Sequence, residues 1–182
     1  MVYMNAYHDR PTFYLNGNPA QPLRAGGVLF YRDSNVEREV LLIKNATGRY
    51  EDLGGKTDAV DRTIYDTIAR ETWEETNKKI AAHVVYKQAR QGIPVYTRSS
   101  KYLMVIVRAN PYEARLTTED FGPLEIHDNF PRTIHWVKLA DLPGLTLHPR
   151  LELAAIRQAL PRVDLAAIQG LHLDDFPVVP KK

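Results

Sequence analysis

The chain has 182 residues, which suits a single domain with a core large enough to fold without disulfide support. Cysteine is absent, so disulfides, thiol nucleophiles and cysteine-based zinc sites are excluded. A net charge of +2 is too small to indicate nucleic-acid binding, and the longest purely apolar run, residues 103–107, is far shorter than a membrane span. We therefore expect a soluble cytoplasmic protein without a membrane partner. The sequence leaves open whether it is a monomer or a homodimer.

The first part of the chain predicts an arm followed by two paired strands. Residues 1–24 combine aromatic residues with three prolines and the pair Asn16-Gly17, which indicates an N-terminal arm or hairpin packed on the domain. A base-stacking role for these aromatics is the alternative. The apolar and β-branched runs at residues 25–31 and 39–44 predict the two strands of a hairpin, because a polar loop separates them.

A glycine turn and a helix are expected next. Residues 50–53 predict a short strand that ends in a turn at Gly54-Gly55, where the missing side chains allow a ligand to approach the backbone. Thr63, three residues before Asp66, gives a pattern close to a capping box and marks the start of a helix. Two rows of residues spaced by four supply its core face: Ile64, Ile68 and Thr72, and beside them Tyr65, Ala69 and Trp73. Asn77 stands at the helix end, where it tolerates a left-handed backbone.

The remainder of the chain completes a mixed α and β pattern. Further strands are predicted at residues 80–86, 95–97, 102–107 and 133–137. Residues 149–160 open on a proline and carry regularly spaced apolar side chains, so a second long helix is expected there. Residues 163–182 predict a short helix and a loose tail. The main domain thus spans residues 25–162 and is expected to be α/β or α+β, with helices covering a mixed sheet.

The first predicted helix carries three glutamates on one face. At about 100° per residue, Glu75 lies about 40° from Glu71 around the helix axis, and Glu74 lies about 60° from Glu71 in the opposite direction. The three side chains therefore converge within one turn. Such carboxylates repel one another, and more strongly where water is excluded. A hard cation such as Mg²⁺, which takes oxygen ligands and shares them with phosphates, would offset this repulsion. The alternative is a solvated acidic face on a surface helix.

The motif is specific enough to resemble a known family. Gly54-Gly55, followed at a set distance by Arg70-Glu71-Thr72-Trp73-Glu74-Glu75, resembles the box of the Nudix (MutT-like) pyrophosphohydrolases. The chain departs from the box at three places. Asp61 stands where a glutamate is usual, the gap that follows it is one residue longer, and Asn77 replaces a common glycine. Asp61 keeps the charge and the glutamates keep their register, so we expect a working site.

The resemblance implies both a fold and a chemistry. The fold would be a Nudix-like α/β/α sandwich with a mixed β-sheet between helices, and the activity would be Mg²⁺-dependent hydrolysis of a diphosphate linkage, with Mn²⁺ as a substitute metal. The resemblance assigns Glu71, Glu74 and Glu75 to the metal, with the Gly54 carbonyl as a further ligand. Either Glu71 or Glu75 would also help to deprotonate the attacking water. Arg70 is expected to orient a glutamate through a forked ion pair.

Many Nudix proteins draw a further carboxylate from a loop before a late strand. The candidates here are Glu119, Asp120, Glu125 and Asp128. We assign this role to Glu125, because it lies in a loop with glycine and proline ahead of Trp136; a solvated loop acid is the alternative. Asp61 is expected to stabilise the loop or the helix start rather than to bind metal.

Basic residues near the motif bear on the substrate. We assign Lys44, Arg49 and Lys56, together with Gly55, to substrate binding, although each basic residue could equally belong to a solvated strand face. The main hypothesis is a nucleoside diphosphate linked to another moiety, such as ADP-ribose, a dinucleotide or a nucleotide sugar. The alternative is a highly phosphorylated substrate, such as capped RNA, a dinucleoside polyphosphate or a diphosphoinositol polyphosphate. A non-catalytic Nudix binding module is a third hypothesis, which the retained motif glutamates disfavour.

Overall fold

The computed structural model describes residues 10–34, 37–151, 154, 156 and 159. The strands are β1 (Phe13–Tyr14), β2 (Pro22–Leu23), β3 (Ala25–Asp33), β4 (Arg38–Asn45), β5 (Tyr50–Glu51), β6 (Leu53–Lys56), β7 (Ile93–Thr97), β8 (Tyr102–Arg108), β9 (Leu124–Glu125) and β10 (Phe130–Lys138). The helices are α1 (Ile64–Glu75), α2 (Ala82–Gln91) and α3 (Thr118–Phe121), with short 3-10 helices at Leu15–Gly17, Glu113–Arg115 and Leu139–Gly144. Within these ranges, none of the helices is long and apolar enough to cross a membrane.

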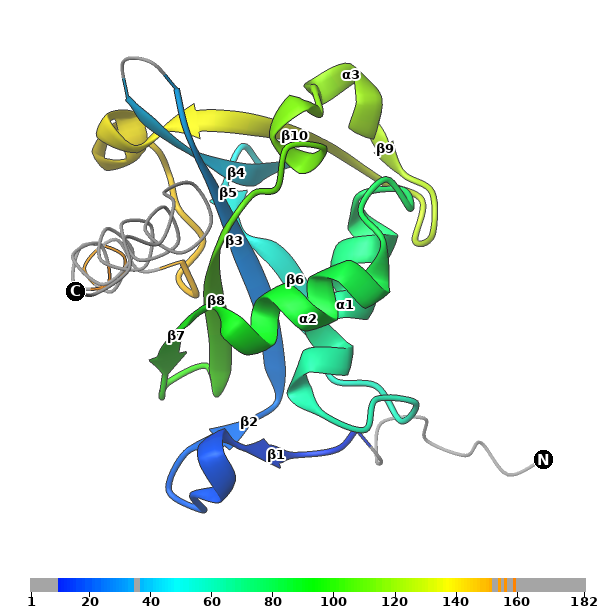
Figure 1. The fold of residues 1–182 in the computed structure, drawn as a ribbon, viewed down its shortest axis with the longest axis vertical. Helices are drawn as coiled ribbons and strands as arrows, with labels where there is room; N and C mark the ends of the chain where they lie inside the picture. Colours follow the sequence, from blue (N-terminus) through cyan, green and yellow to red (C-terminus); the bar gives the residue numbers. More distant parts are fainter. Residues whose placement is uncertain (1–9, 35–36, 152–153, 155, 157–158, 160–182) are drawn as a thin grey trace, which may run out of the picture.

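A single mixed sheet forms the centre of the domain. Its strand order is β7-β8-β3-β4-β10-β9, with β5 paired to β4 and β6 paired to β3. β3 and β8 run parallel, whereas the other pairs in this sheet are antiparallel. Helices α1 and α2 pack against each other on one side of the sheet (Figure 1). The predicted class, a mixed sheet covered by helices, is confirmed.

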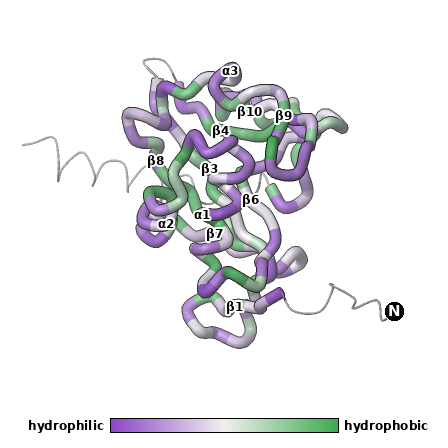
Figure 2. The backbone as a smooth tube through the Cα atoms, turned by 90° about the vertical axis from the view of Figure 1, so that its right-hand side faces the viewer, coloured by the Kyte–Doolittle hydropathy of each residue, from purple (hydrophilic) through white to green (hydrophobic). Residues whose placement is uncertain are grey.

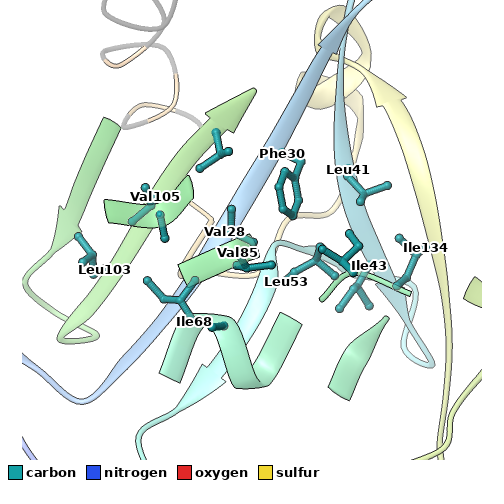
Figure 3. Close-up of a cluster of buried hydrophobic side chains, with 14 of the residues drawn as sticks. Val28, Phe30, Leu41, Ile43, Leu53, Ile68, Val85, Leu103, Val105 and Ile134 are labelled. Carbon is teal, nitrogen blue, oxygen red and sulfur yellow. The ribbon is translucent and has the colours of Figure 1, made fainter. Parts of the chain in front are cut away.

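The central strands are buried on both faces. In β3, Val28 and Phe30 belong to the cluster that packs under α1 and α2, whereas Leu29 and Tyr31 belong to a second cluster on the other face. Side chains alternate between the two faces of a strand, so a strand covered on both sides carries a continuous apolar run. Figure 3 shows the first cluster, and Figure 2 shows hydrophobic stretches following the strands and hydrophilic ones on the surrounding loops.

Most of the predicted strands are present. Those expected at residues 25–31, 39–44, 95–97, 102–107 and 133–137 are confirmed as β3, β4, β7, β8 and β10. Residues 13–23 form a separate two-stranded sheet in which Phe13 pairs with Leu23. Residues 1–9 and 163–182 lie outside the described part of the chain, as does half of the helix predicted at residues 149–160.

The predicted glycine turn is wrong. Gly54 and Gly55 lie inside β6, where they pair with Gly27 and Gly26 of β3. A Cβ atom on Gly54 would overlap the Gly27 backbone and the Tyr102 hydroxyl, so the glycines allow two strands to approach each other closely. The turn itself comes later, in the loop of residues 57–63 that leads to α1.

Helix α1 begins and ends as the sequence predicts. Thr63 and Asp66 form the capping box, with the Thr63 hydroxyl accepting from the Asp66 N–H and the Asp66 carboxylate accepting from the Thr63 N–H. Asn77 has a φ of 51°, the left-handed conformation expected at this position. Its side chain also donates to the carbonyls of Phe121 and Leu124, each at 2.8 Å. Asparagine therefore adds two side-chain hydrogen bonds to the segment between α3 and β9, which a glycine at this position could not make.

The strand predicted at residues 80–86 is wrong, because residues 82–86 belong to helix α2. Its β-branched valines favour a strand locally. In the folded chain, Val85 and Ala89, four residues apart, are both buried in the cluster that also contains Ile68 of α1. Helix-on-helix packing therefore overrides the local propensity.

Candidate active site

The end of helix α1 and the edge of the sheet enclose a pocket of about 370 Å³. Glu75 from α1, Glu51 from β5 and Glu125 from β9 line it, together with Arg132 from β10. These four residues come from four separate elements, so the pocket exists only in the folded chain. The predicted extra carboxylate, Glu125, thus lies in the same pocket as Glu75, and its role as a metal ligand remains a prediction.

Glu71 lies beside this pocket and packs against the backbone of β6. A Cβ atom on Gly55 would overlap the Glu71 carboxyl group, so a larger residue at this position would force that carboxylate to shift. Burial raises the pKa of Glu71; the Arg70 guanidinium opposes this effect, and the neighbouring carboxylates Glu74 and Glu125 add to it. Glycine at 55 therefore gives the Glu71 carboxylate room in this conformation, and its role in substrate binding stays a prediction.

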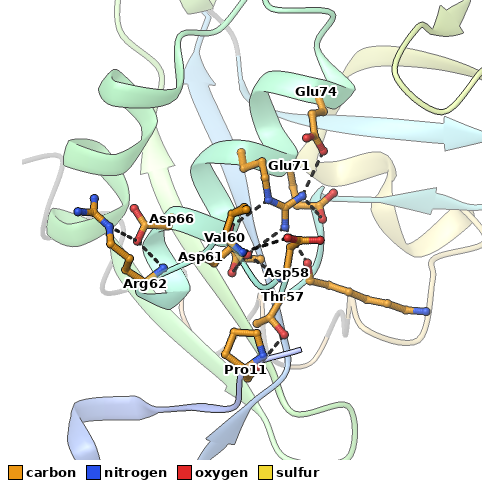
Figure 4. A network of polar contacts seen from close by, with 12 residues as sticks. Pro11, Thr57, Asp58, Val60, Asp61, Arg62, Asp66, Glu71 and Glu74 are labelled. Atoms are coloured by element: carbon orange, nitrogen blue, oxygen red, sulfur yellow. Dashed lines mark hydrogen bonds and ion pairs between the residues drawn. The ribbon is translucent and has the colours of Figure 1, made fainter. Parts of the chain in front are cut away.

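Arg70 joins two glutamates of α1 to Asp61 in the loop before the helix. Its Nε and one Nη each donate to Asp61 at 3.0 Å, while the other Nη donates to Glu71 at 3.0 Å and to Glu74 at 3.2 Å (Figure 4). We predicted a forked ion pair between Arg70 and a glutamate, and the partner in that prediction is wrong. The forked pair is made with Asp61, and the glutamates share the remaining nitrogen.

Asp61 stabilises the loop and the helix start, as expected for it. Its carboxylate also accepts from the Asp58 N–H and from the Thr67 hydroxyl, both at 2.8 Å. Burial raises the pKa of Asp61, but the hydrogen bonds from Arg70, Asp58 and Thr67 outweigh it, so the pKa lies below the usual 3.8. An aspartate in place of the common glutamate fits this closely bonded loop.

Replacing Asp61 by asparagine is expected to destabilise the fold by roughly 1.5–3 kcal/mol at pH 7, because a charged acceptor of several hydrogen bonds is lost. The carboxylate has a lowered folded-state pKa, so its contribution is complete above about pH 3.8 and is lost as the pH falls through the lower folded-state value. Urea unfolding followed by circular dichroism at pH 7 and at pH 3.5 measures both effects. Asp141→Asn, a change at an exposed aspartate, is the control. A loss that is equal at the two pH values would contradict this role of the charge.

Glu75 is the most strongly perturbed carboxylate of the site. Burial raises its pKa well above the usual value; Arg150 opposes this, and Glu71, Glu125 and Asp52 reinforce it. Its Oε2 atom is buried and has no hydrogen-bond partner in the described part of the chain. A buried carboxylate oxygen without a partner is unfavourable by itself and is offset by a cation.

The donor set suits a hard divalent cation, although the carboxylates are not gathered around one point. Glutamate oxygens are the ligands that Mg²⁺ and Mn²⁺ prefer. Within the described ranges, however, no three Asp, Glu or His side chains are close enough together to hold a metal ion. Two of the carboxylates, Glu71 and Glu74, are engaged by Arg70 in ion pairs of 3.0 and 3.2 Å.

Arg150 is a residue of the site that the sequence did not reveal. Its guanidinium donates to the Asp52 carboxylate and to the carbonyls of Asp52 and Gly54, all at 3.0 Å, and lies over the Tyr102 ring. Asp52 also accepts from the Tyr102 hydroxyl at 2.7 Å. The Gly54 carbonyl is therefore already engaged by an internal cation, and its role as a metal ligand stays a prediction.

The predicted basic residues do not line the pocket. Lys44, Arg49 and Lys56 are exposed, and none of them is among the residues that line it. Lys44 lies on the opposite face of β4 from Ile43 and Asn45, which do line the pocket, because side chains alternate along a strand. Their substrate-binding roles stay predictions. A basic residue that does line the pocket, Arg132, was missed because it lies inside a strand, far along the sequence from the motif.

Comparisons with known proteins address the fold. No family model and no curated protein matches the sequence. Among solved structures, a mutT/nudix family protein from Listeria innocua is similar with a TM-score of 0.51 and 15% identity, over 80% of this chain and 95% of that one. An Ap4A hydrolase from C. elegans is similar with a TM-score of 0.49 and 17% identity, over 78% of this chain and 98% of that one. RenU, a Nudix hydrolase from M. smegmatis, is similar with a TM-score of 0.46 and 18% identity, over 93% of this chain and 98% of that one. Together with the mixed sheet and the position of α1, the similarity to the Listeria protein identifies the fold of this chain as the Nudix fold.

Proposed function

We propose that this protein is a Mg²⁺-dependent hydrolase that cleaves the diphosphate linkage of a nucleoside diphosphate joined to another moiety. One observation carries the proposal. Glu75 and Glu125 reach the same pocket from α1 and β9, Glu71 lies beside them, and one oxygen of Glu75 is buried there without a partner. An acidic pocket with an uncompensated carboxylate is suited to a divalent cation and the phosphate oxygens that share it.

Each residue of the site has a distinct part in this proposal. Glu71, Glu75 and Glu125 would hold Mg²⁺, and Glu74 is a further carboxylate kept close by Arg70. The bound metal would neutralise charge on the phosphate oxygens and lower the pKa of a water molecule. Arg70 restrains Glu71 until a cation competes for it. Arg132 holds the end of α1 through the Glu75 carbonyl and anchors the Glu125 loop through the Gly122 carbonyl. Glu71 or Glu75 is the base that accepts a proton from the attacking water.

The charge of the pocket favours a diphosphate over a highly phosphorylated substrate. Arg132 is the one basic side chain among the described residues that line it, and three glutamates line it as well. A polyphosphate, an RNA cap or an inositol pyrophosphate would bring more negative charge than one arginine and one metal site offset. A substrate with two bridged phosphates matches the available positive charge better.

A substrate panel tests this proposal. The intact chain is incubated with Mg²⁺ and ADP-ribose, NADH, a nucleotide sugar, a dinucleoside polyphosphate, capped RNA or an inositol pyrophosphate, and the products are identified by mass. We expect cleavage between the two phosphates of one of the first three compounds, dependent on Mg²⁺. Cleavage confined to the last three would favour the alternative substrate class. No cleavage of any compound, with Mg²⁺ or Mn²⁺ present, would contradict the hydrolase proposal.

A further inference from the structure

The pocket that contains Glu75 and Glu125 has an aromatic side as well as an acidic one. Phe130 lines it, and 63% of this residue is exposed to solvent. Burying an aromatic ring of this size is normally favourable, so a phenylalanine left open at the rim of a pocket is suited to contact with a ligand.

The strand register places Phe130 on the same face of the sheet as the carboxylate of Glu125. Phe130 and Glu125 are direct partners across β9 and β10, and partners across antiparallel strands project from the same face. Arg132, two residues further along β10, projects from that face too. Asn45 is the partner of Arg132 on β4, and all four residues line the pocket. The aromatic ring, the arginine and the carboxylate therefore form one continuous wall.

Arg132 supplies a second observation that points to a ligand. It is 5% exposed, and its two Nη atoms donate to backbone carbonyls that include those of Gly122 and Glu75. Its Nε–H is buried without a partner in the described part of the chain. An orphaned donor of a buried guanidinium is costly unless a ligand oxygen accepts from it, and phosphate oxygens are strong acceptors for arginine.

We propose that Phe130 is the residue that selects a nucleotide, by stacking on the nucleobase while a phosphate oxygen accepts from Arg132 Nε. This inference rests on the proposed function, since it assumes that the reacting phosphates lie at the acidic end of the same pocket. Aromatic stacking contributes affinity for every base, because each base has a π face. Phe130 is then expected to distinguish nucleotides from phosphate compounds without a planar group.

Binding of nucleoside monophosphates tests the proposal without requiring turnover. The probes are AMP, GMP, CMP and UMP, with inorganic phosphate as the probe without a base, and isothermal titration calorimetry on the intact chain gives each Kd. Phe130→Ala is expected to raise the Kd of the tightest-binding nucleotide about tenfold and to leave that of phosphate unchanged. Phe130→Trp should keep the Kd within about threefold of the unaltered protein, because the aromatic face is retained.

Ile126 provides the matched control. It is a large hydrophobic residue of the same β9–β10 hairpin, is 73% exposed, and does not line the pocket. Ile126→Ala should therefore leave every Kd unchanged. The inference is overturned if no nucleotide binds the unaltered protein, if Phe130→Ala weakens phosphate as much as nucleotide, or if Ile126→Ala has the same effect. Phe130-dependent binding without hydrolysis of any compound would refute only the proposed reaction, whereas hydrolysis without Phe130-dependent binding would refute only this inference.

Discussion

Replacing Glu75 by glutamine is expected to lower Mg²⁺-dependent hydrolysis about a thousandfold while the protein stays folded. Metal-ion catalysis contributes several kcal/mol of transition-state stabilisation, and Glu75 is the carboxylate with an unpaired oxygen in the pocket. Without metal, the change replaces a buried, poorly compensated charge by a neutral amide of nearly the same shape. The melting temperature of the metal-free variant should therefore be no lower than that of the unaltered protein.

Metal-dependent thermal shift separates this prediction from a general loss of structure. Mg²⁺ or Mn²⁺ should raise the melting temperature of the unaltered protein, because it binds the folded state, and should not raise that of Glu75→Gln. Glu119→Gln, at an exposed glutamate of α3, is the control and should retain both turnover and thermal shift. Turnover of Glu75→Gln within about threefold of the unaltered protein would contradict the assigned role of this carboxylate.

Replacing Arg150 by methionine is expected to cost roughly 3–5 kcal/mol of folding free energy, the typical loss when one partner of a buried ion pair is removed. The Arg150 side chain is 15% exposed and that of Asp52 is fully buried, so Asp52 would lose its cation in a site that water does not reach. For a chain of this length, the loss corresponds to a fall in melting temperature of roughly 10 °C. Urea unfolding followed by circular dichroism measures it.

A double variant tests whether the buried charge causes this loss. Asp52→Asn combined with Arg150→Met removes both charges, and the remaining amide can still accept from the Tyr102 hydroxyl. We expect the double variant to recover part of the stability that Arg150→Met loses. Arg115→Met, at an exposed arginine, should change the free energy of unfolding by less than about 0.5 kcal/mol. Equal losses in the single and double variants would show that packing rather than charge explains the effect.

The parts of the fold that depend on short stretches of sequence were predictable. The capping box of Thr63 and Asp66, the left-handed Asn77 and the paired strands β3 and β4 each follow from signals within a few residues. The glutamate face of α1 follows from helical periodicity in the same way. Where tertiary packing competes with a local signal, as at Val85 of α2, the prediction was wrong.

The parts of the site that depend on strand register and distant contacts were not predictable. Arg150 contacts Asp52 across 98 residues of sequence, and no local pattern links the two. The fork of Arg70 onto Asp61 depends on the path of the loop before α1, which is one residue longer than the motif leads one to expect. Gly54 and Gly55 carry a strong sequence signal, but the sequence does not show that they lie in a strand, where Gly54 allows close pairing with β3 and Gly55 lies against the Glu71 carboxylate.

Anomalous X-ray diffraction from crystals soaked in MnCl₂ tests the central claim most directly, because it locates a divalent cation independently of any substrate. We expect a manganese peak in the pocket, with carboxylate oxygens of Glu71 and Glu75 as ligands and Glu71 turned away from Arg70. The same soak with Glu75→Gln crystals should give no peak there. A peak elsewhere, or none in the unaltered protein, would contradict the proposed metal site and the hydrolysis that depends on it.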